Sequence, residues 1–392
     1  MSTTASVTTA IEAARDELVT LSHYIHDNPE LGYEEFLSAE ACAGALERNG
    51  FVVERGIAGL TTAFRATKGS GALRLVYCAE YDALPDVGHA CGHNIIAASS
   101  VGAAIGLGAV ADELDATVIV LGTPSEEGGG GKIDLINAGY FDDVHAAMMI
   151  HPWPGDAGPV FSDRQLGACL AVDQFDVTFS GKEAHASAAP WEGVNALDAM
   201  TISQVAIGLL RQQLTPGDQV HLVILEGGSA ANIIPHHVVA RVMVRATTLD
   251  KLNVLRERVN KCFEAGALAT GATMAMNLIG HTFSHMSTDV DIIKHYRSAA
   301  ESLGRSFDAD DRGAPIPTFS TDMANVSLVV PSIHPLLGIT ATGAVNHQPE
   351  FTAACVTSGA DQAMIEGATA LALTGVRVAT DQQLRTRLLE RA

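Results

Sequence analysis

The residues of this chain that could do chemistry follow three apolar stretches. Cys91 and His93 follow the first stretch, in the segment AEYDALPDVGHACGHN. Glu126 and Glu127 follow the second, in TPSEEGGGG, and His151 lies at the end of the third, in IHPW. A thiolate, imidazoles and carboxylates are the ligands that Zn²⁺ and similar borderline metals take from proteins. One glutamate of an adjacent pair could bind a metal while its neighbour acts as a general base on metal-bound water.

Other interpretations of Cys91 remain open from these residues alone. Cys91 could be a nucleophile with His151 as its base, because His93 is too near in sequence to be its obvious partner. A redox centre would need C-x-x-C, which the sequence lacks. A single C-x-H, a glutamate pair or a histidine before proline is weak evidence by itself. Their joint position after apolar stretches favours a metal site.

A parallel α/β sheet would position these residues. We expect strands at 72–80, 116–124 and 145–152, and a helix at 95–114 rich in small residues. In such a sheet helices cover both faces, and ligands bind beyond the carboxyl ends of the strands. The polar groups would then converge on one edge, where Asp82 could orient a ligand imidazole.

A second pattern begins near residue 169. Strand, helix, strand, strand, helix and strand follow in order, with the helices at about 195–214 and 249–271. This β-α-β-β-α-β order is typical of a ferredoxin-like α+β domain. Helical patterns and apolar strands such as SLVVPSIHPLLGI resume after about residue 286. We therefore expect a metal-binding catalytic domain at 1–168 and 287–392, with a smaller domain inserted at 169–286.

Composition excludes several classes of protein. The formal net charge is −21, which argues against nucleic acid and anionic membrane surfaces as partners. No signal-peptide pattern opens the sequence, and no apolar run reaches membrane-spanning length. The six cysteines are scattered without disulfide-framework spacing, so we expect reduced thiols and a cytoplasmic protein.

Eight motifs occur in an order that resembles one family of hydrolases. That family is the dinuclear metallo-amidohydrolases and peptidases, which include aminoacylases, carnosinases and bacterial carboxypeptidase G. The chain looks most similar to the branch of indole-acetyl-amino-acid hydrolases, aminobenzoyl-glutamate hydrolase and β-alanyl-lysine dipeptidase, and STDMANVS (320–327) supports the last two. The resemblance covers nearly the whole chain. The motifs are HDNPELGYEE (26–35), YDALP (81–85), HACGHN (89–94), SEEGGGG (125–131), IHPWP (150–154), GKEAHAS (181–187), GGSAANIIP (227–235) and NHQPEF (346–351).

The resemblance implies a metal site and a mechanism. Glu126 takes the family's general-base position and would activate a metal-bridging water that attacks the amide carbonyl. Many relatives have Asp where this chain has Asn94, which leaves the preferred metal open. Two divalent ions per chain are implied, zinc or manganese first, then cobalt or nickel. The ligand positions carry over to Cys91, His93, Glu127, His151 and His347.

The resemblance also implies that the inserted domain is a lid and the contact of a homodimer. His185 would reach the active site of a partner subunit, and Asn232 and Arg245 would bind substrate. An arginine fork matches a substrate carboxylate. Without the resemblance, His185 is a polar loop residue, Asn232 a turn residue and Arg245 an exposed strand charge.

We therefore expect a metal-dependent hydrolase that cleaves the amide bond of N-acyl amino acids or small dipeptides. One alternative is an amidase for a non-peptide or xenobiotic N-acyl amine. Another is a catalytically silent metal-binding regulatory protein. The presence of Glu126 and all five ligand positions argues against the silent protein.

Overall fold

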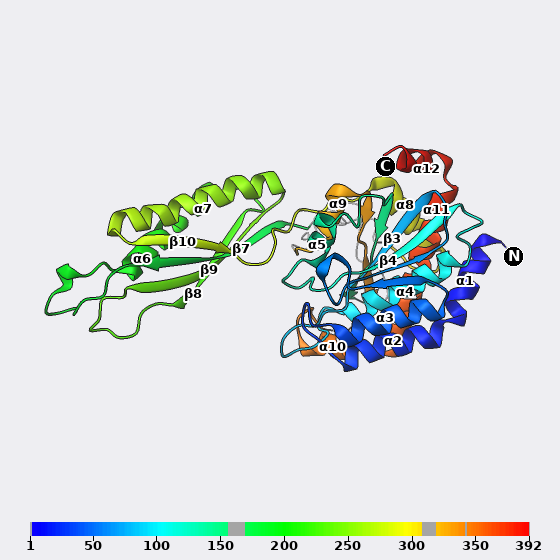
Figure 1. Ribbon diagram of the computed structural model, residues 1–392, viewed down its shortest axis with the longest axis horizontal. Coiled ribbons are helices and arrows are strands. Elements are labelled where there is room, and N and C mark those ends of the chain that lie inside the picture. Colours follow the sequence, from blue (N-terminus) through cyan, green and yellow to red (C-terminus); the bar gives the residue numbers. More distant parts are fainter. Residues whose placement is uncertain (1, 156–168, 308–318, 342, 392) are drawn as a thin grey trace. The chain divides into compact units, whose positions relative to one another are not determined.

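The computed structural model describes residues 2–155, 169–307, 319–341 and 343–391 (Figure 1). Two compact units form, and the smaller one is Cys169–His285 together with Ser320. The domain boundary expected after residue 168 falls where the described chain resumes. No helix among the described residues is both long and apolar enough to cross a membrane.

A mixed six-stranded sheet forms the centre of the larger unit, in the order β1-β2-β4-β3-β5-β11. β3 pairs in parallel with β4 and β5, and β5 pairs in parallel with β11. β1 and β2 add an antiparallel edge beside β4, which the sequence analysis did not anticipate. The strands are β1 (Val52–Arg55), β2 (Phe64–Lys68), β3 (Leu73–Ala79), β4 (Ala116–Gly122), β5 (Ala146–Met148) and β11 (Ser332–Ile333).

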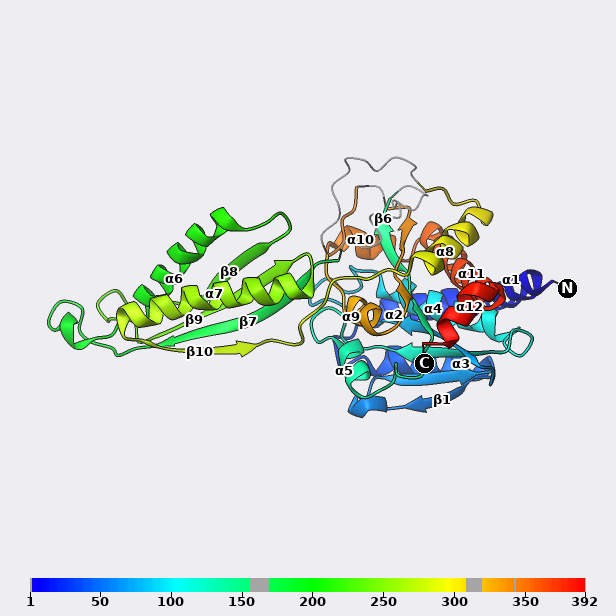
Figure 2. The same ribbon diagram turned by 90° about the horizontal axis from the view of Figure 1, so that it is seen from above.

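One face of this sheet is covered by α4 (His93–Gly108) and α11 (Ser358–Thr380) (Figure 2). The hydroxyl of Tyr77 in β3 donates a hydrogen bond of 3.1 Å to the carbonyl of Leu371 in α11. Every residue of α4 is buried, and its many small residues allow neighbouring helices to approach closely. A Cβ atom on Gly102 would lie 2.9 Å from a methyl carbon of Leu18 in α2.

The opposite face is covered by α5 (Gly131–Asn137) and α9 (Met323–Val329). Val76 of β3 belongs to one apolar cluster with Leu135 of α5 and Met323 of α9. Helices thus cover both faces of a largely parallel sheet, and the predicted fold class is confirmed. The other helices of this unit are α1 (Thr3–Ala13), α2 (Arg15–Asp27), η1 (Ile57–Gly59), α3 (Phe36–Arg48), α8 (Val290–Ser302), α10 (Pro349–Ala354) and α12 (Gln382–Leu389).

Two predicted strands differ from the structure. The strand expected at 145–152 leaves the large sheet at Met148, and His151 opens a separate strand, β6 (His151–Pro154), paired with β12 (Leu336–Ile339). Pro152 has no N–H to donate, which limits the pairing of this segment. Residues 327–329, expected in an apolar strand, end α9 instead. Periodicity alone does not separate a short buried strand from a buried helix.

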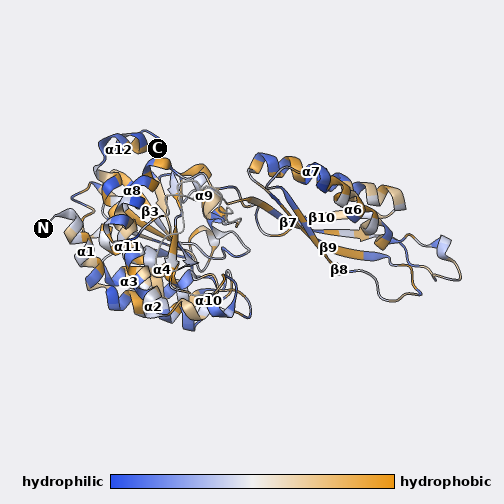
Figure 3. Ribbon diagram, turned by 180° about the vertical axis from the view of Figure 1, so that it is seen from behind, coloured by the Kyte–Doolittle hydropathy of each residue, from blue (hydrophilic) through white to orange (hydrophobic). Residues whose placement is uncertain are grey.

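The smaller unit contains a four-stranded antiparallel sheet in the order β10-β7-β9-β8, as expected for a ferredoxin-like domain. Alternate residues of β9, such as Val238 and Val242, pack with residues of α6 and α7 in one core, while Arg241 and Arg245 lie on the other face. Figure 3 shows hydrophilic and hydrophobic residues mixed along α7, as amphipathic packing requires. The elements are β7 (Ala171–Ser180), η2 (Pro190–Glu192), α6 (Ala196–Leu210), η3 (Arg211–Gln213), β8 (Gln219–Glu226), β9 (His237–Ala246), α7 (Leu249–Thr270) and β10 (Thr273–Leu278).

Candidate metal centre and active site

Polar side chains converge beyond the carboxyl ends of β3 and β4. The ligand atoms of Cys91, His93 and His151 lie within 4.8 Å of one another, and so do those of Cys91, Glu127 and His347. Cys91 belongs to both groups, so its sulfur lies between two sets of possible donors. We call these five residues the metal-facing cluster.

Asp82 orients two members of this cluster. One of its carboxylate oxygens lies 2.9 Å from Nδ1 of His93, and the other accepts the backbone N–H of Glu127 at 2.9 Å. Burial would lower the pKa of His93, but the carboxylate of Asp82 outweighs burial and raises that pKa well above its usual range. The Nε2 atom of His93 faces the cluster and has no hydrogen-bond partner among the described residues.

His151 and Cys91 face each other. Nδ1 of His151 lies 2.8 Å from the carbonyl oxygen of Pro152 and donates to it, so Nε2 keeps a free lone pair 3.3 Å from the sulfur of Cys91. Burial and the charge of His93 lower the pKa of His151 to about 3, which keeps the ring neutral. Burial raises the pKa of the Cys91 thiol well above its usual range. A nucleophilic cysteine needs a lowered pKa, so this environment favours a ligand role.

The glutamate pair lies on the loop between β4 and α5. Oε1 of Glu127 lies 3.8 Å from Nε2 of His93 and 3.7 Å from Nε2 of His347. Oε2 of Glu126 also lies 3.8 Å from Nε2 of His93. Burial, then the charges of Glu80 and Glu127, raise the pKa of Glu126 well above its usual range. A carboxyl group with a raised pKa can both accept and return a proton.

The motif at residues 26–35 supports this loop. Ser125, directly before the pair, has a φ of 58°, a conformation that residues with a Cβ rarely adopt. Its backbone N–H donates to Glu35 at 2.8 Å, and the other oxygen of Glu35 accepts the Thr62 hydroxyl at 2.9 Å. A Cβ atom on Gly32 would collide with the Ser125 hydroxyl oxygen, so only glycine fits there without a shift.

His347 approaches from the segment before α10. Its backbone N–H donates to the carbonyl of Ala90 at 2.8 Å, which ties this segment to the loop of Cys91. The side chain is 56% exposed, unlike the fully buried His93. His347 therefore forms the solvent-facing side of the cluster.

Sequence reasoning missed three buried charged residues beside the cluster. Lys132 of α5 donates from Nζ to Glu80 and, at 2.7 Å, to Asp322. All three side chains are fully buried. In the sequence Glu80 looks only like the end of a strand, although its position two residues before Asp82 is a signal that could have drawn attention to it. His334 is also buried, with its ring centroid 5.8 Å from that of His151.

The three predicted lid residues lie in the smaller unit. His185 is exposed, and its Nδ1 accepts the backbone N–H groups of Ser187 at 3.3 Å and Ala188 at 3.2 Å. The neutral ring therefore carries its proton on Nε2. The structure brings His185 beside Asn232, whose carbonyl accepts the N–H of Ala186 at 3.0 Å.

Arg245 lies apart from these two, on the face of the lid sheet that α6 and α7 do not cover. Its guanidinium contacts the sulfur of Met243 at 3.2 Å. Burial lowers the pKa of Arg245, but an arginine stays charged at neutral pH.

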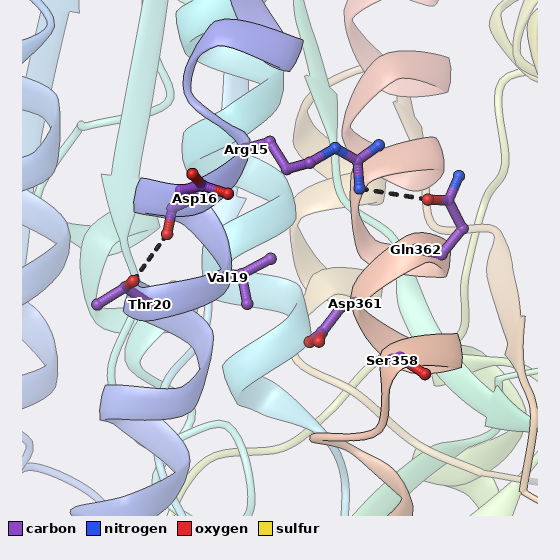
Figure 4. A pocket seen from close by; sticks show the side chains of 7 residues that line it. All are labelled: Arg15, Asp16, Val19, Thr20, Ser358, Asp361 and Gln362. Atoms are coloured by element: carbon purple, nitrogen blue, oxygen red, sulfur yellow. Dashed lines mark hydrogen bonds between the residues drawn. The ribbon is translucent and has the colours of Figure 1, made fainter.

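A cavity of about 420 Å³ lies between α2 and α11 in the larger unit (Figure 4). Arg15 donates to Gln362 at 3.2 Å across it. None of the cluster residues lines this cavity, and no cysteine or histidine does, so it is not the candidate active site. Its lining residues are Arg15, Asp16, Val19, Thr20, Ser358, Asp361 and Gln362.

The fold and the cluster define a class of protein: an α/β hydrolase of amide bonds that depends on metal, with an inserted ferredoxin-like unit. The family model of the M20 peptidase dimerisation domain matches residues 172–270. The chain is 39% identical over 390 residues to the Xaa-Arg dipeptidase of Mus musculus, a match that covers 94% of this chain and 87% of that protein. The chain belongs to the M20 peptidase family, which confirms the predicted family and enzyme class.

Further similarities agree. The chain is 34% identical over 285 residues to a p-aminobenzoyl-glutamate hydrolase of Escherichia coli, covering 68% of this chain and 58% of that protein. An aminobenzoyl-glutamate utilization protein from Klebsiella pneumoniae superposes with a TM-score of 0.72 at 20% identity, covering 93% of this chain and 96% of that one. A dinuclear metal binding peptidase of the M20 family from Bacillus subtilis superposes with a TM-score of 0.70 at 21% identity, covering 94% and 99%. These two structures share the fold.

Proposed function

We propose that this chain is a dinuclear metallopeptidase that hydrolyses dipeptides or N-acyl amino acids. The observation that carries the proposal is the position of Cys91 between two groups of donors, one with His93 and His151 and one with Glu127 and His347. The residues fit a cation, because Nε2 of His93 and Oε1 of Glu127 are buried without a hydrogen-bond partner among the described residues. Thiolate and imidazole donors favour zinc, and carboxylates also suit manganese, with cobalt or nickel as further candidates.

Glu126 acts as the general base in this proposal. When bound, the metal ions would supply Lewis-acid polarisation of the attacking water and the amide carbonyl. Glu126 takes the proton of the attacking water and returns it to the leaving amine. Asp82 keeps Nε2 of His93 turned toward the metals by holding Nδ1.

The substrate contacts come from the lid residues. The N–H at Nε2 of His185 is a suitable donor for the oxyanion that develops on the carbonyl oxygen. Arg245 and Asn232 bind the substrate carboxylate and its neighbouring amide. Xaa-Arg dipeptides are the first substrates to test, because the relative of that name matches 94% of this chain.

We also propose a homodimer formed through the lid. Ile202, Val205 and Leu209 form an exposed apolar stripe on α6, at helical spacing, with 37%, 60% and 59% of each residue exposed. β8 is an edge strand of the lid sheet, and exposed edges pair readily with another chain. In this dimer His185 of one chain serves the metal site of the other.

The remaining predictions stay part of this proposal. The catalytic domain would comprise 1–168 and 287–392, and the lid 169–286. All six cysteines are unpaired, which suits the reducing cytoplasm. The charge of −21 argues against nucleic acid and membrane partners.

The test combines metal analysis with a mixed substrate library. Protein loaded with zinc or manganese is incubated with dipeptides, N-acyl amino acids and N-acyl amines without a carboxylate, and consumption is followed by mass spectrometry. We expect two metal ions per chain and consumption of substrates that carry a carboxylate. Consumption of the amines alone would favour the non-peptide amidase, and metal binding without any turnover would favour the silent regulatory protein.

A further inference from the structure

Glu80 is a buried carboxylate whose position is fixed by a salt bridge. It follows directly after β3 and is 0% exposed. Lys132, equally buried, donates from Nζ to Oε1 of Glu80 and to Asp322, and its backbone N–H donates to the second oxygen of Asp322 at 3.0 Å. Charge-assisted contacts of this kind restrict the orientation of both partners. The salt bridge therefore determines where the second oxygen of Glu80 points.

That second oxygen, Oε2, points into the metal-facing cluster. It has no hydrogen-bond partner among the described residues and lies 3.7 Å from Nε2 of His93. The ligand atoms of Glu80, His93 and Glu126 all lie within 4.8 Å of one another. Oε1 of Glu127, also without a partner among the described residues, lies 3.8 Å from the same nitrogen.

Buried polar atoms without partners are unfavourable, and three of them surround one point here. Lone pairs on two carboxylate oxygens and one imidazole nitrogen cannot satisfy one another, whereas a single cation could satisfy all three. Two ligands of a tetrahedral zinc ion, each about 2.1 Å from it, lie about 3.4 Å apart. The 3.7 Å between Glu80 and His93 is close to this separation.

We infer that Glu80 is a further metal ligand, which binds the cation held by His93. The inference rests on the proposed function, since it requires a cation at this site. Lys132 then has a defined role: it holds one oxygen of Glu80 and leaves the other for the metal. It also offsets part of the negative charge that the clustered carboxylates bring into the interior.

Metal affinity of the apo protein tests this inference without relying on activity. Wild type, Glu80→Gln and Glu35→Gln are titrated with Zn²⁺ and with Mn²⁺ in metal-buffered solutions, and bound ions per chain are counted by mass spectrometry. We expect Glu80→Gln to bind one ion at least about 10-fold more weakly, because removing even an outer-shell partner commonly has that effect. Glu35→Gln is the matched control and should bind both ions as the wild type does. Glu35 is also 0% exposed, but both of its oxygens accept hydrogen bonds, from Ser125 and Thr62.

Co²⁺ provides a second measurement, because its visible absorption depends on the number and type of ligands. The spectrum of Glu80→Gln should differ from that of the wild type, and the spectrum of Glu35→Gln should not. If Glu80→Gln alone fails to fold, as judged by circular dichroism, the double variant Glu80→Gln/Lys132→Met removes both charges of the pair and should show the same weakened site. Unchanged affinity and an unchanged Co²⁺ spectrum in the folded variant would overturn the inference. Failure of the wild type itself to bind metal would instead overturn the proposed function.

Discussion

Asp82 shows how much a single buried carboxylate can determine at this site. It holds the ring of His93 with one oxygen and the backbone of Glu127 with the other. Two adjacent glutamates on the same loop then have different surroundings: Glu126 is 6% exposed and has a raised pKa, whereas the side chain of Glu127 is 17% exposed and lies between two histidines. These differences support different chemical roles for the two.

The glutamate pair provides the first prediction. Glu126→Gln should retain both metals and the fold but lower kcat by at least about 100-fold, since the amide cannot accept a proton from water. Glu127→Gln should instead lower metal occupancy. Metal content and steady-state kinetics of the two variants distinguish these outcomes. Near-normal turnover in Glu126→Gln would show that another group is the base.

Cys91 provides the second prediction. Cys91→Ser should lose metal and activity together, because the thiolate donor to both groups is replaced by a poorly ionised hydroxyl. An alkylating reagent should modify Cys91 more slowly in the metal-loaded protein than in the apo protein, as followed by mass spectrometry of the labelled peptide. Full metal content in Cys91→Ser would exclude Cys91 as an essential ligand.

At the scale of elements, the active-site loops are held by neighbours that never touch the reacting atoms. The segment before α3 supports the loop between β4 and α5 through Glu35, and it packs Gly32 against Ser125. The conformation of Ser125 is one that glycine adopts without strain. The sequence motif at 26–35 therefore acts by positioning.

Glu35 gives the third prediction. Glu35→Ala should lower kcat by roughly 10-fold, because a displaced loop misaligns Glu126. Ser125→Gly should partly restore the rate in the double variant, since glycine makes the left-handed conformation easier to adopt. Glu35→Gln, which can still accept the N–H of Ser125, should stay close to the wild type in kcat. A double variant no faster than Glu35→Ala would contradict the positioning role.

Glu35 also gives a prediction on pH. Burial, then the charge of Asp82, raise its pKa to about 7 from an ordinary value of 4.5. The folded protein therefore holds this proton at pH values where the unfolded chain has released it, and its contribution to stability is lost as pH rises from 4.5 through 7. Glu35→Gln cannot ionise, so its free energy of unfolding relative to the wild type should increase between pH 5 and pH 8. Denaturant unfolding of both apo proteins measures this, and a pH-independent difference would refute it.

At the scale of the whole molecule, the apolar stripe on α6 and the edge strand β8 are surfaces that a second copy could cover. A symmetric twofold contact is the commonest arrangement for soluble chains. The exposed Nε2 of His185 could then act on a site that its own chain does not contain.

Subunit mixing gives the fifth prediction. His185→Ala should keep its metals but lose rate by about 100-fold or more, as expected when a donor to an oxyanion is removed. Mixing this variant with Glu126→Gln should restore up to half of the wild-type activity per heterodimer, because one site then carries both lesions and the other carries neither. Subunit exchange is verified by native mass spectrometry. Proven exchange without recovered activity would mean that His185 acts in its own chain or not at all.

Much of the site could be predicted from the sequence because it depends on the order of strands. Cys91, His93 and the glutamate pair each follow a short apolar strand, and parallel strands end at one edge of a sheet. The β-α-β-β-α-β order of the inserted unit could be predicted for the same reason. His347 followed only from a resemblance, since nothing in its local pattern indicates a ligand.

The tertiary structure alone revealed the residues that orient the site. Lys132 joins Glu80 and Asp322, which lie 52 and 190 residues from it in the chain. His151 proved to open a strand outside the large sheet, although the apolar run had suggested continuity. Local periodicity reports which face of an element is buried but not which distant element covers it, so contacts between segments far apart in sequence appear only once the chain has folded.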